Sequence, residues 1–277
     1  MFLESAAVKL HLSGVKMKEN TAAVIKTSLK EKFSSKWDEC SVLFFSAPCG
    51  CGKTTTVREL IARKRVQEID VTDGKVVFDS VKKNCDVIFI DDFQIVQDRN
   101  EQQILAELIR RKNDLHFVIL SRGPVPGALM PFIFDGKLET FSTEDLLFDR
   151  LTTQKFLEAY GIKMPANDIS AIQQDIKGYP AAMEILRRKL IESAEYSKNI
   201  YNEVKRDLFI YYDETVYRRY DDDIRSLLLC MASFEEGFSL ELARMVSGNS
   251  NAGELIEEIM KTSTMLRFDS DENYNFW

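Results

Sequence analysis

The sequence predicts an α/β fold with three αβα layers, in which helices cover both faces of a parallel sheet of about five strands. Short apolar runs alternate with helical patterns, as buried parallel strands and their connecting helices do. A glycine-rich stretch, "APCGCGKTT" at 47–55, stands between one such run and a helical pattern. A second apolar run ends in two aspartates, Asp91 and Asp92. Two smaller, mainly helical units follow the predicted sheet domain.

Length and composition indicate a globular protein with two or three structural units. The chain has 277 residues, of which 45% are hydrophobic, with 12 Gly and 6 Pro. Its five cysteines are odd in number and have no regular spacing in pairs, which indicates reduced thiols rather than a disulfide framework. No apolar run approaches the roughly 20 residues of a membrane helix, and the start of the chain lacks a signal-peptide pattern. We therefore expect a cytoplasmic protein with no membrane partner.

The charge is unevenly distributed along the chain. The net charge is −7, and Tyr201–Trp277 carry 16 acidic and 8 basic residues. A protein that binds the nucleic-acid backbone presents a basic stripe to the phosphates. Neither the first 200 residues nor Tyr201–Trp277 has such a stripe. We therefore expect no direct nucleic-acid binding by this segment.

The first forty residues predict a helical lead-in, with one amphipathic helix over Thr21–Trp37. The apolar run Ser41–Ser46 then predicts a buried strand, and the pattern after the glycines, with Val57 and Leu60 at helical spacing, predicts a helix. Strand, glycine-rich loop, Gly-Lys-Thr and helix form the context of a phosphate-binding P-loop. Ala47 stands where the P-loop consensus has its first glycine.

The backbone N–H groups of 50–54 are expected to wrap a phosphate, assisted by the positive end of the following helix. Lys53 is expected to reach the β- and γ-phosphates, and the Thr54 hydroxyl to bind Mg²⁺. The predicted nucleotide-binding residues of this loop are Ala47, Pro48, Cys49, Gly50, Cys51, Gly52, Lys53, Thr54 and Thr55.

A metal clip on Cys49 and Cys51 is the alternative interpretation of the same stretch. Zinc sites of this kind need a second pair of Cys or His ligands. The two histidines, His11 and His116, are isolated in the sequence, and no other cysteine forms a spaced motif with them. The loop is therefore interpreted as a cradle for phosphate.

Two further apolar runs predict strands that end in charged residues. Val87–Ile90 lead into Asp91 and Asp92, and the strand predicted over His116–Arg122 ends in Arg122 itself. Ligands of open α/β sheets bind at the carboxyl ends of the strands. Asp91 is expected to hold Mg²⁺, Asp92 to polarise the attacking water, and Arg122 to contact the γ-phosphate. An acidic turn and a surface arginine capping a strand are the structural alternatives.

The remaining strands of the sheet are predicted at 66–71 and 137–141. A helix is predicted over Glu101–Lys112, with Ile104, Leu105 and Leu108 on its buried face. After the sheet, Gly178 suits the end of one helix and Pro180 the first turn of the next.

The last part of the chain predicts three helices and a hairpin, the layout of a winged helix. "DDDIRSLLLCMASF" begins with an acidic cap, "SLELARMVSG" has Ser239 as N-cap and Gly248 after its end, and "AGELIEEIMKTS" is amphipathic. The short runs "TMLRFD" and "YNFW" flank a polar turn. The acidic charge of this unit argues against a DNA-binding winged helix.

Taken in order, these motifs resemble the nucleotide-binding core of STAND ATPases of the MalT/LuxR-type bacterial transcriptional regulators. The motifs are "FFSAPCGCGKTTTVREL", "VIFIDDFQIV", "HFVILSRGPVPGAL", "KLETFSTEDLLFDRLTTQKFLEAYGI" and "IQQDIKGYPAAMEIL". Two features depart from the family pattern. The distance from Lys53 to Asp91 is short, so a helix or two of the sheet layer is expected to be missing, and Gln94 stands where a histidine is common.

The resemblance covers about Ser41 to Trp277 and implies three domains after the helical lead-in at 1–40: a nucleotide-binding domain at 41–145, a helical lid at 146–200 and a regulatory winged helix at 201–277. It also implies that Pro180 packs near the adenine. A plain helix start remains the alternative for that proline.

The implied function is that of an ATP- and ADP-binding signal-transduction module that hydrolyses ATP slowly and uses Mg²⁺. With ADP the winged helix would hold the module closed, and ATP with an inducer would release it to self-associate. One alternative is a loader or initiator ATPase of the AAA+ type, which would carry a second arginine sensor on the lid helices. The other is a scaffold that binds nucleotide without turnover.

The sequence also predicts that this chain is the front end of a longer regulator. Phe276 and Trp277 are large aromatic residues at the very end of the sequence, where polar residues are usual. The resemblance implies that a sensor domain and a DNA-binding domain follow this module, and that DNA binding belongs to those domains.

Overall fold

The computed structural model describes residues 23–71, 73–76, 84–193, 195–234, 237–268 and 273–276. The lead-in helix predicted from Thr21 is present as α1, Thr27–Glu39. The first 22 residues and Trp277, on which part of the lead-in and of the chain-end prediction rest, lie outside the described residues.

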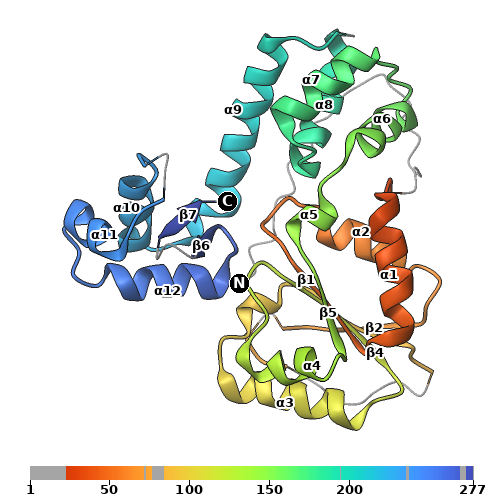
Figure 1. Ribbon diagram of the computed structural model, residues 1–277, viewed down its shortest axis with the longest axis vertical. Helices are drawn as coiled ribbons and strands as arrows, with labels where there is room; N and C mark the ends of the chain where they lie inside the picture. Colours follow the sequence, from red (N-terminus) through yellow and green to blue (C-terminus); the bar gives the residue numbers. More distant parts are fainter. Residues whose placement is uncertain are drawn as a thin grey trace, which may run out of the picture.

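Five parallel strands form the central sheet (Figure 1). They are β1 Val42–Ser46, β2 Val66–Ile69, β3 Val87–Ile90, β4 His116–Ser121 and β5 Leu138–Phe141. Their order in the sheet is β2-β3-β4-β1-β5, and every neighbouring pair is parallel. The predicted five-stranded parallel sheet is confirmed. Between Lys53 and Asp91 the described residues contain α2, Lys53–Leu60, and the strands β2 and β3, while residues 72 and 77–83 lie outside the described residues.

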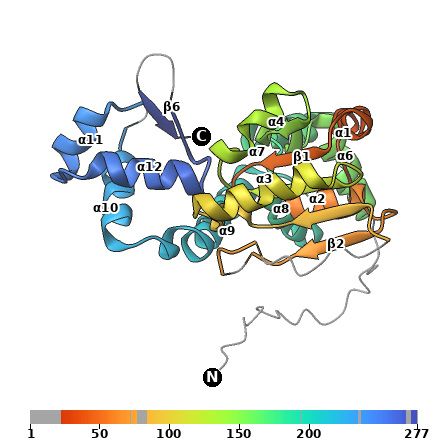
Figure 2. The same cartoon turned by 90° about the horizontal axis from the view of Figure 1, so that it is seen from below.

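Alternate residues of the central strands point to opposite faces, and helices cover both (Figures 1 and 2). On one face, Leu43 and Phe45 pack with residues of α1 and of α2, Lys53–Leu60. On the other face, Val42 and Phe44 pack with residues of α3, Arg99–Arg111, and α4, Met130–Phe134. The three-layer αβα prediction is therefore confirmed. Two 3₁₀ turns, η1 Phe93–Ile95 and η2 Gly127–Leu129, connect elements on the second face.

The predicted buried face of α3 was wrong by one residue. Ile104 is 48% exposed, while Leu105, Ala106 and Ile109 are buried and Leu108 packs at the edge of the core. The sequence has consecutive apolar residues at 104–106 and at 108–109, and two stripes of the same spacing can be drawn through them. Packing against the sheet selects the stripe that includes the small Ala106.

Helices α5 to α9 extend the core of the α1 and α2 face away from the sheet (Figure 1). They are α5 Thr143–Leu146, α6 Arg150–Ala159, α7 Ala166–Ile176, α8 Pro180–Ser193 and α9 Lys198–Thr215.

As predicted, Gly178 follows a helix and Pro180 begins the next. Gly178 has φ +71°, and a Cβ there would lie 1.9 Å from the Phe148 carbonyl oxygen. Glycine is therefore required where these segments cross.

The C-terminal unit, residues 217–276 as far as they are described, has a separate hydrophobic core. It contains η3 Tyr217–Arg219, α10 Asp222–Met231, α11 Leu240–Ser247, α12 Ala252–Thr262 and the antiparallel strands β6 Leu266–Phe268 and β7 Tyr274–Phe276. Asp221 and Ser239 cap α10 and α11 by accepting backbone N–H groups. The predicted order of three helices and a hairpin is present. No helix in the described ranges is both long enough and apolar enough to cross a membrane.

We predict that Phe45→Ala lowers the free energy of unfolding by about 3–5 kcal/mol. Phe45 is fully buried, and its ring stacks on Phe141 at 4.3 Å between centroids, with 9° between the planes. Phe134→Ala is the matched control, because that ring is 84% exposed. Denaturant unfolding of both variants measures the difference. Equal, small losses in the two variants would contradict this description of the core.

Candidate functional site

The glycine loop, residues 47–52, connects β1 directly to α2. Gly50 and Gly52 have φ values of +82° and +76°, a region that favours glycine. The Ala47 N–H donates to the Ser121 carbonyl at 3.2 Å, which ties the start of the loop to the end of β4. The loop therefore follows a buried strand, turns through two left-handed glycines and opens a helix, as the sequence predicted.

Lys53 folds back on this loop. Its Nζ donates to the carbonyl oxygens of Ala47 at 2.6 Å and Pro48 at 3.0 Å, and the residue is 9% exposed. Burial lowers the pKa of Lys53 below its ordinary value. These two carbonyls supply the partners that a buried ammonium requires. An anionic ligand in the loop would be a stronger partner for the same group.

Thr54, Asp91 and Asp92 meet at the carboxyl end of β3. The Thr54 Oγ1 donates to Asp91 Oδ2 at 2.8 Å, and the Asp92 N–H donates to Asp91 Oδ1 at 2.8 Å. Asp92 adopts the left-handed conformation, with φ 52°. Asp and Asn tolerate this conformation better than most residues. A hydroxyl and a carboxylate, both hard oxygen ligands, thus stand together beside the loop.

Arg122 follows β4 and faces the same site. Its Nη2 lies 3.3 Å from Asp92 Oδ1. Gln94 connects the two residues, because its Nε2 donates to Asp92 Oδ1 at 2.8 Å and its Oε1 accepts the Arg122 N–H at 2.8 Å. The structure therefore brings Lys53, Thr54, Asp91, Asp92 and Arg122 to one edge of the sheet. Sequence reasoning missed Gln94, although the "DDFQ" box was a signal for it.

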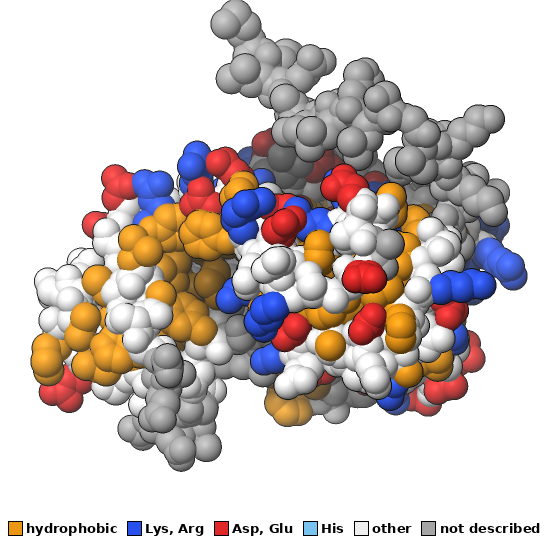
Figure 3. Space-filling model, turned by 90° about the horizontal axis from the view of Figure 1, so that it is seen from above, with side chains coloured by type: hydrophobic (Ala, Val, Ile, Leu, Met, Phe, Trp, Pro, Cys, Tyr) orange, Lys and Arg blue, Asp and Glu red, His pale blue; other side chains and the backbone are white. Residues whose placement is uncertain are grey.

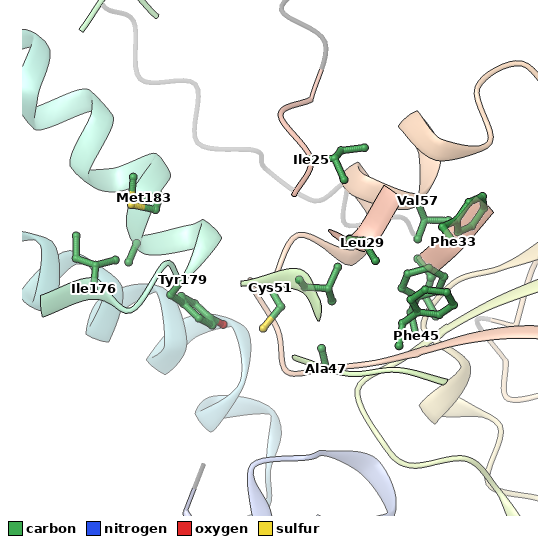
Figure 4. Close-up of a cluster of buried hydrophobic side chains, with 14 of the residues drawn as sticks. Ile25, Leu29, Phe33, Phe45, Ala47, Cys51, Val57, Ile176, Tyr179 and Met183 are labelled. Carbon is green, nitrogen blue, oxygen red and sulfur yellow. The ribbon is translucent and has the colours of Figure 1, made fainter. Parts of the chain in front are cut away.

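Two tyrosines cover the loop from the helices beyond the sheet. Tyr179, just before α8, donates its hydroxyl to the Cys49 carbonyl. The single O–H of Tyr212 of α9 can donate to the same carbonyl, at 3.2 Å, or to the Tyr179 hydroxyl, which is also within hydrogen-bond distance. Burial raises the pKa of both phenols above the ordinary value, so both remain neutral donors at physiological pH. Figure 4 shows Tyr179 directed toward the loop at Cys51.

The start of α8 also contacts the loop directly. The Ala181 N–H donates to the Gly50 carbonyl at 3.0 Å, and a Cβ on Gly50 would lie 2.9 Å from the Tyr179 hydroxyl. A Cβ on Gly52 would lie 3.4 Å from the Cβ of Pro180. Pro180 thus lies against the loop, and the two glycines make room for α8 as well as shaping the turn. Sequence reasoning missed both tyrosines, since no local pattern distinguishes them from other core aromatics.

The loop cysteines have different environments. Cys51 is fully buried, and burial raises the pKa of its thiol to about 11. The Cys49 Sγ lies 3.2 Å from the Tyr211 hydroxyl. In the part of the chain that the structure describes, no three His, Cys, Asp or Glu side chains are grouped as a metal site would need. A metal clip on these cysteines therefore has no further protein ligand there.

The C-terminal unit touches the end of β4 beside the site. The Thr264 N–H donates to the Arg122 carbonyl at 2.7 Å, and a Cβ on Gly123 would lie 2.3 Å from the Lys261 carbonyl oxygen. A mainly apolar cavity of about 1090 Å³ lies between this unit, α9 and the sheet edge. Its lining includes Cys49, Asp92, Arg122, Tyr212, Tyr220 and Leu229. Figure 3 shows hydrophobic side chains gathered over the C-terminal part of the surface.

No protein-family model matches the chain, and a search of curated proteins finds no match. Among solved structures, it is similar to a Walker-type ATPase of Pyrococcus abyssi, with 13% identity over 92% of this chain and 93% of that one and a TM-score of 0.62. A weaker likeness is to the Thermotoga maritima RuvB Holliday junction branch migration motor, with 14% identity over 90% of this chain and 91% of that one and a TM-score of 0.48. Another is to a Pyrococcus horikoshii STAND protein with a tetratricopeptide repeat sensor, with 14% identity over 89% of this chain and 40% of that one and a TM-score of 0.44. The first likeness shows that the chain has the fold of a Walker-type ATPase. At 13% identity it shows the fold alone.

We predict that Tyr179→Phe loosens the glycine loop without unfolding the protein. The variant keeps the ring and loses the hydrogen bond to the Cys49 carbonyl, a net contribution of about 0.5–1.5 kcal/mol, together with an acceptor for the Tyr212 hydroxyl. Backbone amide hydrogen exchange at residues 49–53 should become faster. Tyr196→Phe is the control, because the Tyr196 hydroxyl donates to Asp175 at 2.7 Å, away from the loop. Unchanged loop exchange in the Tyr179 variant would mean that the hydroxyl does not restrain the loop.

Proposed function

We propose that this chain is an ATP- and ADP-binding module with slow ATPase activity, in which the glycine loop binds the phosphates. One observation carries the proposal: the loop lysine, a threonine–aspartate pair and an aspartate–arginine pair converge at the carboxyl edge of one parallel sheet. Open α/β sheets bind ligands at this edge. The loop amides and the N-terminus of α2 favour an anion there.

The roles follow from the chemistry of each side chain. Lys53 would exchange its two carbonyl partners for phosphate oxygens. Thr54 and Asp91 have the hydroxyl and carboxylate oxygens that would hold Mg²⁺, which neutralises phosphate charge when it is bound. Asp92 would orient the attacking water, and Arg122 would leave Asp92 for the γ-phosphate. Pro180, which lies against Gly52, would pack near the adenine.

We further propose that nucleotide controls a switch, as in STAND regulators of the MalT/LuxR type. The domain division at 41–145, 146–200 and 201–277 belongs to this proposal, with the last unit as a winged helix. Helix α9, Lys198–Thr215, crosses the last of these boundaries and packs with the helices before it, whereas the core of the C-terminal unit begins at Tyr217. With ADP, the tyrosine contacts to the loop and the Thr264 contact to Arg122 would hold the module closed. ATP with an inducer would favour an open form that self-associates. A ligand shifts this equilibrium only through different contacts in the two forms, and Arg122 can make such different contacts.

The arginines of the helices before α9 support this proposal over a loader of the AAA+ type. Arg150 donates to the Ala166 carbonyl at 3.2 Å. Arg187 pairs with Glu184, with its guanidinium carbon 4.2 Å from the centroid of the Tyr160 ring, and Arg188 also pairs with Glu184. These arginines have structural partners and do not line the cavity beside the loop; the arginines that line it are Arg122 and Arg219, and Arg219 follows α9 and lies outside these helices.

We predict that Lys53→Ala weakens ADP and ATP binding by at least about tenfold, because a charge-assisted hydrogen bond to phosphate contributes about 1.5–3 kcal/mol. Calorimetric titration measures both affinities. Lys155→Ala, at an exposed position of α6, is the matched control.

Equal affinities in the Lys53 and Lys155 variants would overturn the phosphate-binding role of the loop. Phosphate release from the parent protein tests the slow ATPase activity separately. Tight binding without any phosphate release would favour the non-hydrolysing scaffold.

We predict that Gly123→Ala releases the C-terminal unit from the sheet edge. The added methyl would meet the Lys261 carbonyl oxygen at 2.3 Å, so α12 must move. If the docked unit restrains turnover, the ATPase rate should rise by about fivefold or more, the lower range of allosteric coupling. Gly127→Ala is the control, because a Cβ there meets nothing within 4 Å. Matching turnover and matching limited-proteolysis patterns in the two variants would contradict a closed state held at this contact.

A further inference from the structure

Gln94 lies in η1, directly after β3, and its amide spans the ends of two strands. The amide nitrogen donates to Asp92 Oδ1, and the amide oxygen accepts the backbone N–H of Arg122, both at 2.8 Å. The neighbouring Phe93 is buried, with its ring edge-on to Phe44 of β1, and this anchors the short helix on the sheet. The side chain of Gln94 is therefore presented from a fixed segment of backbone.

The two hydrogen bonds require a group that donates and accepts at once. A carboxylate at this position would accept from Arg122 but would repel Asp92. An aliphatic side chain would make neither bond. The amide of glutamine has both functions and the length to reach from the end of β3 to the end of β4.

Asp92 Oδ1 accepts a hydrogen bond from Gln94 Nε2 at 2.8 Å and forms an ion pair with Arg122 Nη2 at 3.3 Å. A bound phosphate would affect these two contacts differently. A γ-phosphate would compete for the Arg122 guanidinium, because phosphate is a strong partner for arginine. It would not compete in the same way for the neutral amide. When Arg122 leaves, Gln94 remains as the donor that holds Asp92.

Asp92 needs such a holder because its backbone is in the left-handed conformation, with φ 52°, and its side chain is 47% exposed. Arg122 is also fixed on both sides of its backbone, with its N–H on Gln94 and its carbonyl on Thr264. The Gln94 amide thus holds the two strand ends at a constant separation while the arginine side chain changes partner.

We propose that Gln94 is a positioning residue for ATP hydrolysis: it orients the Asp92 carboxylate toward the attacking water once Arg122 has moved to the phosphate. This inference rests on the proposed function. It predicts an effect on turnover without a matching effect on binding, because neither ATP nor ADP contacts Gln94 in this scheme.

The test compares Gln94→Leu and Gln94→Glu with the parent protein, and uses Gln154→Leu as the control. Gln154 lies on α6 and donates to Glu158 at 2.8 Å at an exposed position. Both Gln94 variants should lower kcat by about 10- to 100-fold, the range that misplacement of a reacting group produces. Their calorimetric Kd values for ADP and for ATP should stay within about twofold of the parent.

Each other result has a definite meaning. A parent protein that binds nucleotide and hydrolyses ATP, with Gln94 variants at the parent rate, would overturn the role of Gln94 and leave the proposed function intact. A parent that binds no nucleotide would overturn both. Loss of kcat together with both affinities in Gln94→Leu and in Gln94→Glu would also overturn it, because it would assign Gln94 to the fold.

Discussion

The parallel pairing of β3, β4 and β1 is the constraint on which the rest of the structure depends. In register, Ile90 of β3 is opposite Ile119 of β4, and Ser121 of β4 is opposite Ser46 of β1. All three strands therefore end at one edge, and the residue after each end enters the same small volume. A change in the sense of any strand would send its charged residue to the opposite edge, about 15–20 Å away for strands of this length.

The loop at this edge is rich in polar backbone groups, and buried polar groups need partners. The segment just before α8, the start of α8, and α9 supply several of them. Tyr179 donates and Tyr212 can donate to the Cys49 carbonyl, and the Ala181 N–H donates to Gly50. At about 0.5–1.5 kcal/mol net for each hydrogen bond, these three contacts together reach the typical size of an allosteric coupling, 1–3 kcal/mol. This is the size of free energy that nucleotide would have to overcome in the proposed switch.

The sequence was most informative where structure is local. The ends of β1 and β3, helix caps such as Ser239 and the turn at Gly178 depend on near neighbours and were predicted correctly, whereas β2 ends two residues and β4 one residue before the predicted end. The stripe of α3 was ambiguous, because two sets of apolar residues fit the same period and the sheet decides between them. Tyr179, Tyr212 and Gln94 were missed for another reason. Each acts through a hydrogen bond to a residue far along the chain, and residue type alone does not reveal such a bond, since tyrosine is intermediate in burial and glutamine is mostly exposed.

The central claim is that the glycine loop is a phosphate site, and that Lys53 is hydrogen-bonded to the Ala47 and Pro48 carbonyls of the loop until a phosphate binds. A crystal structure of the chain with Mg²⁺ and ADP tests this most directly. We expect Lys53 Nζ to leave the Ala47 and Pro48 carbonyls and to lie within hydrogen-bond distance of a phosphate oxygen, with the amides of 50–54 around the phosphates. Nucleotide bound elsewhere, with Lys53 still on the two carbonyls, would contradict the account.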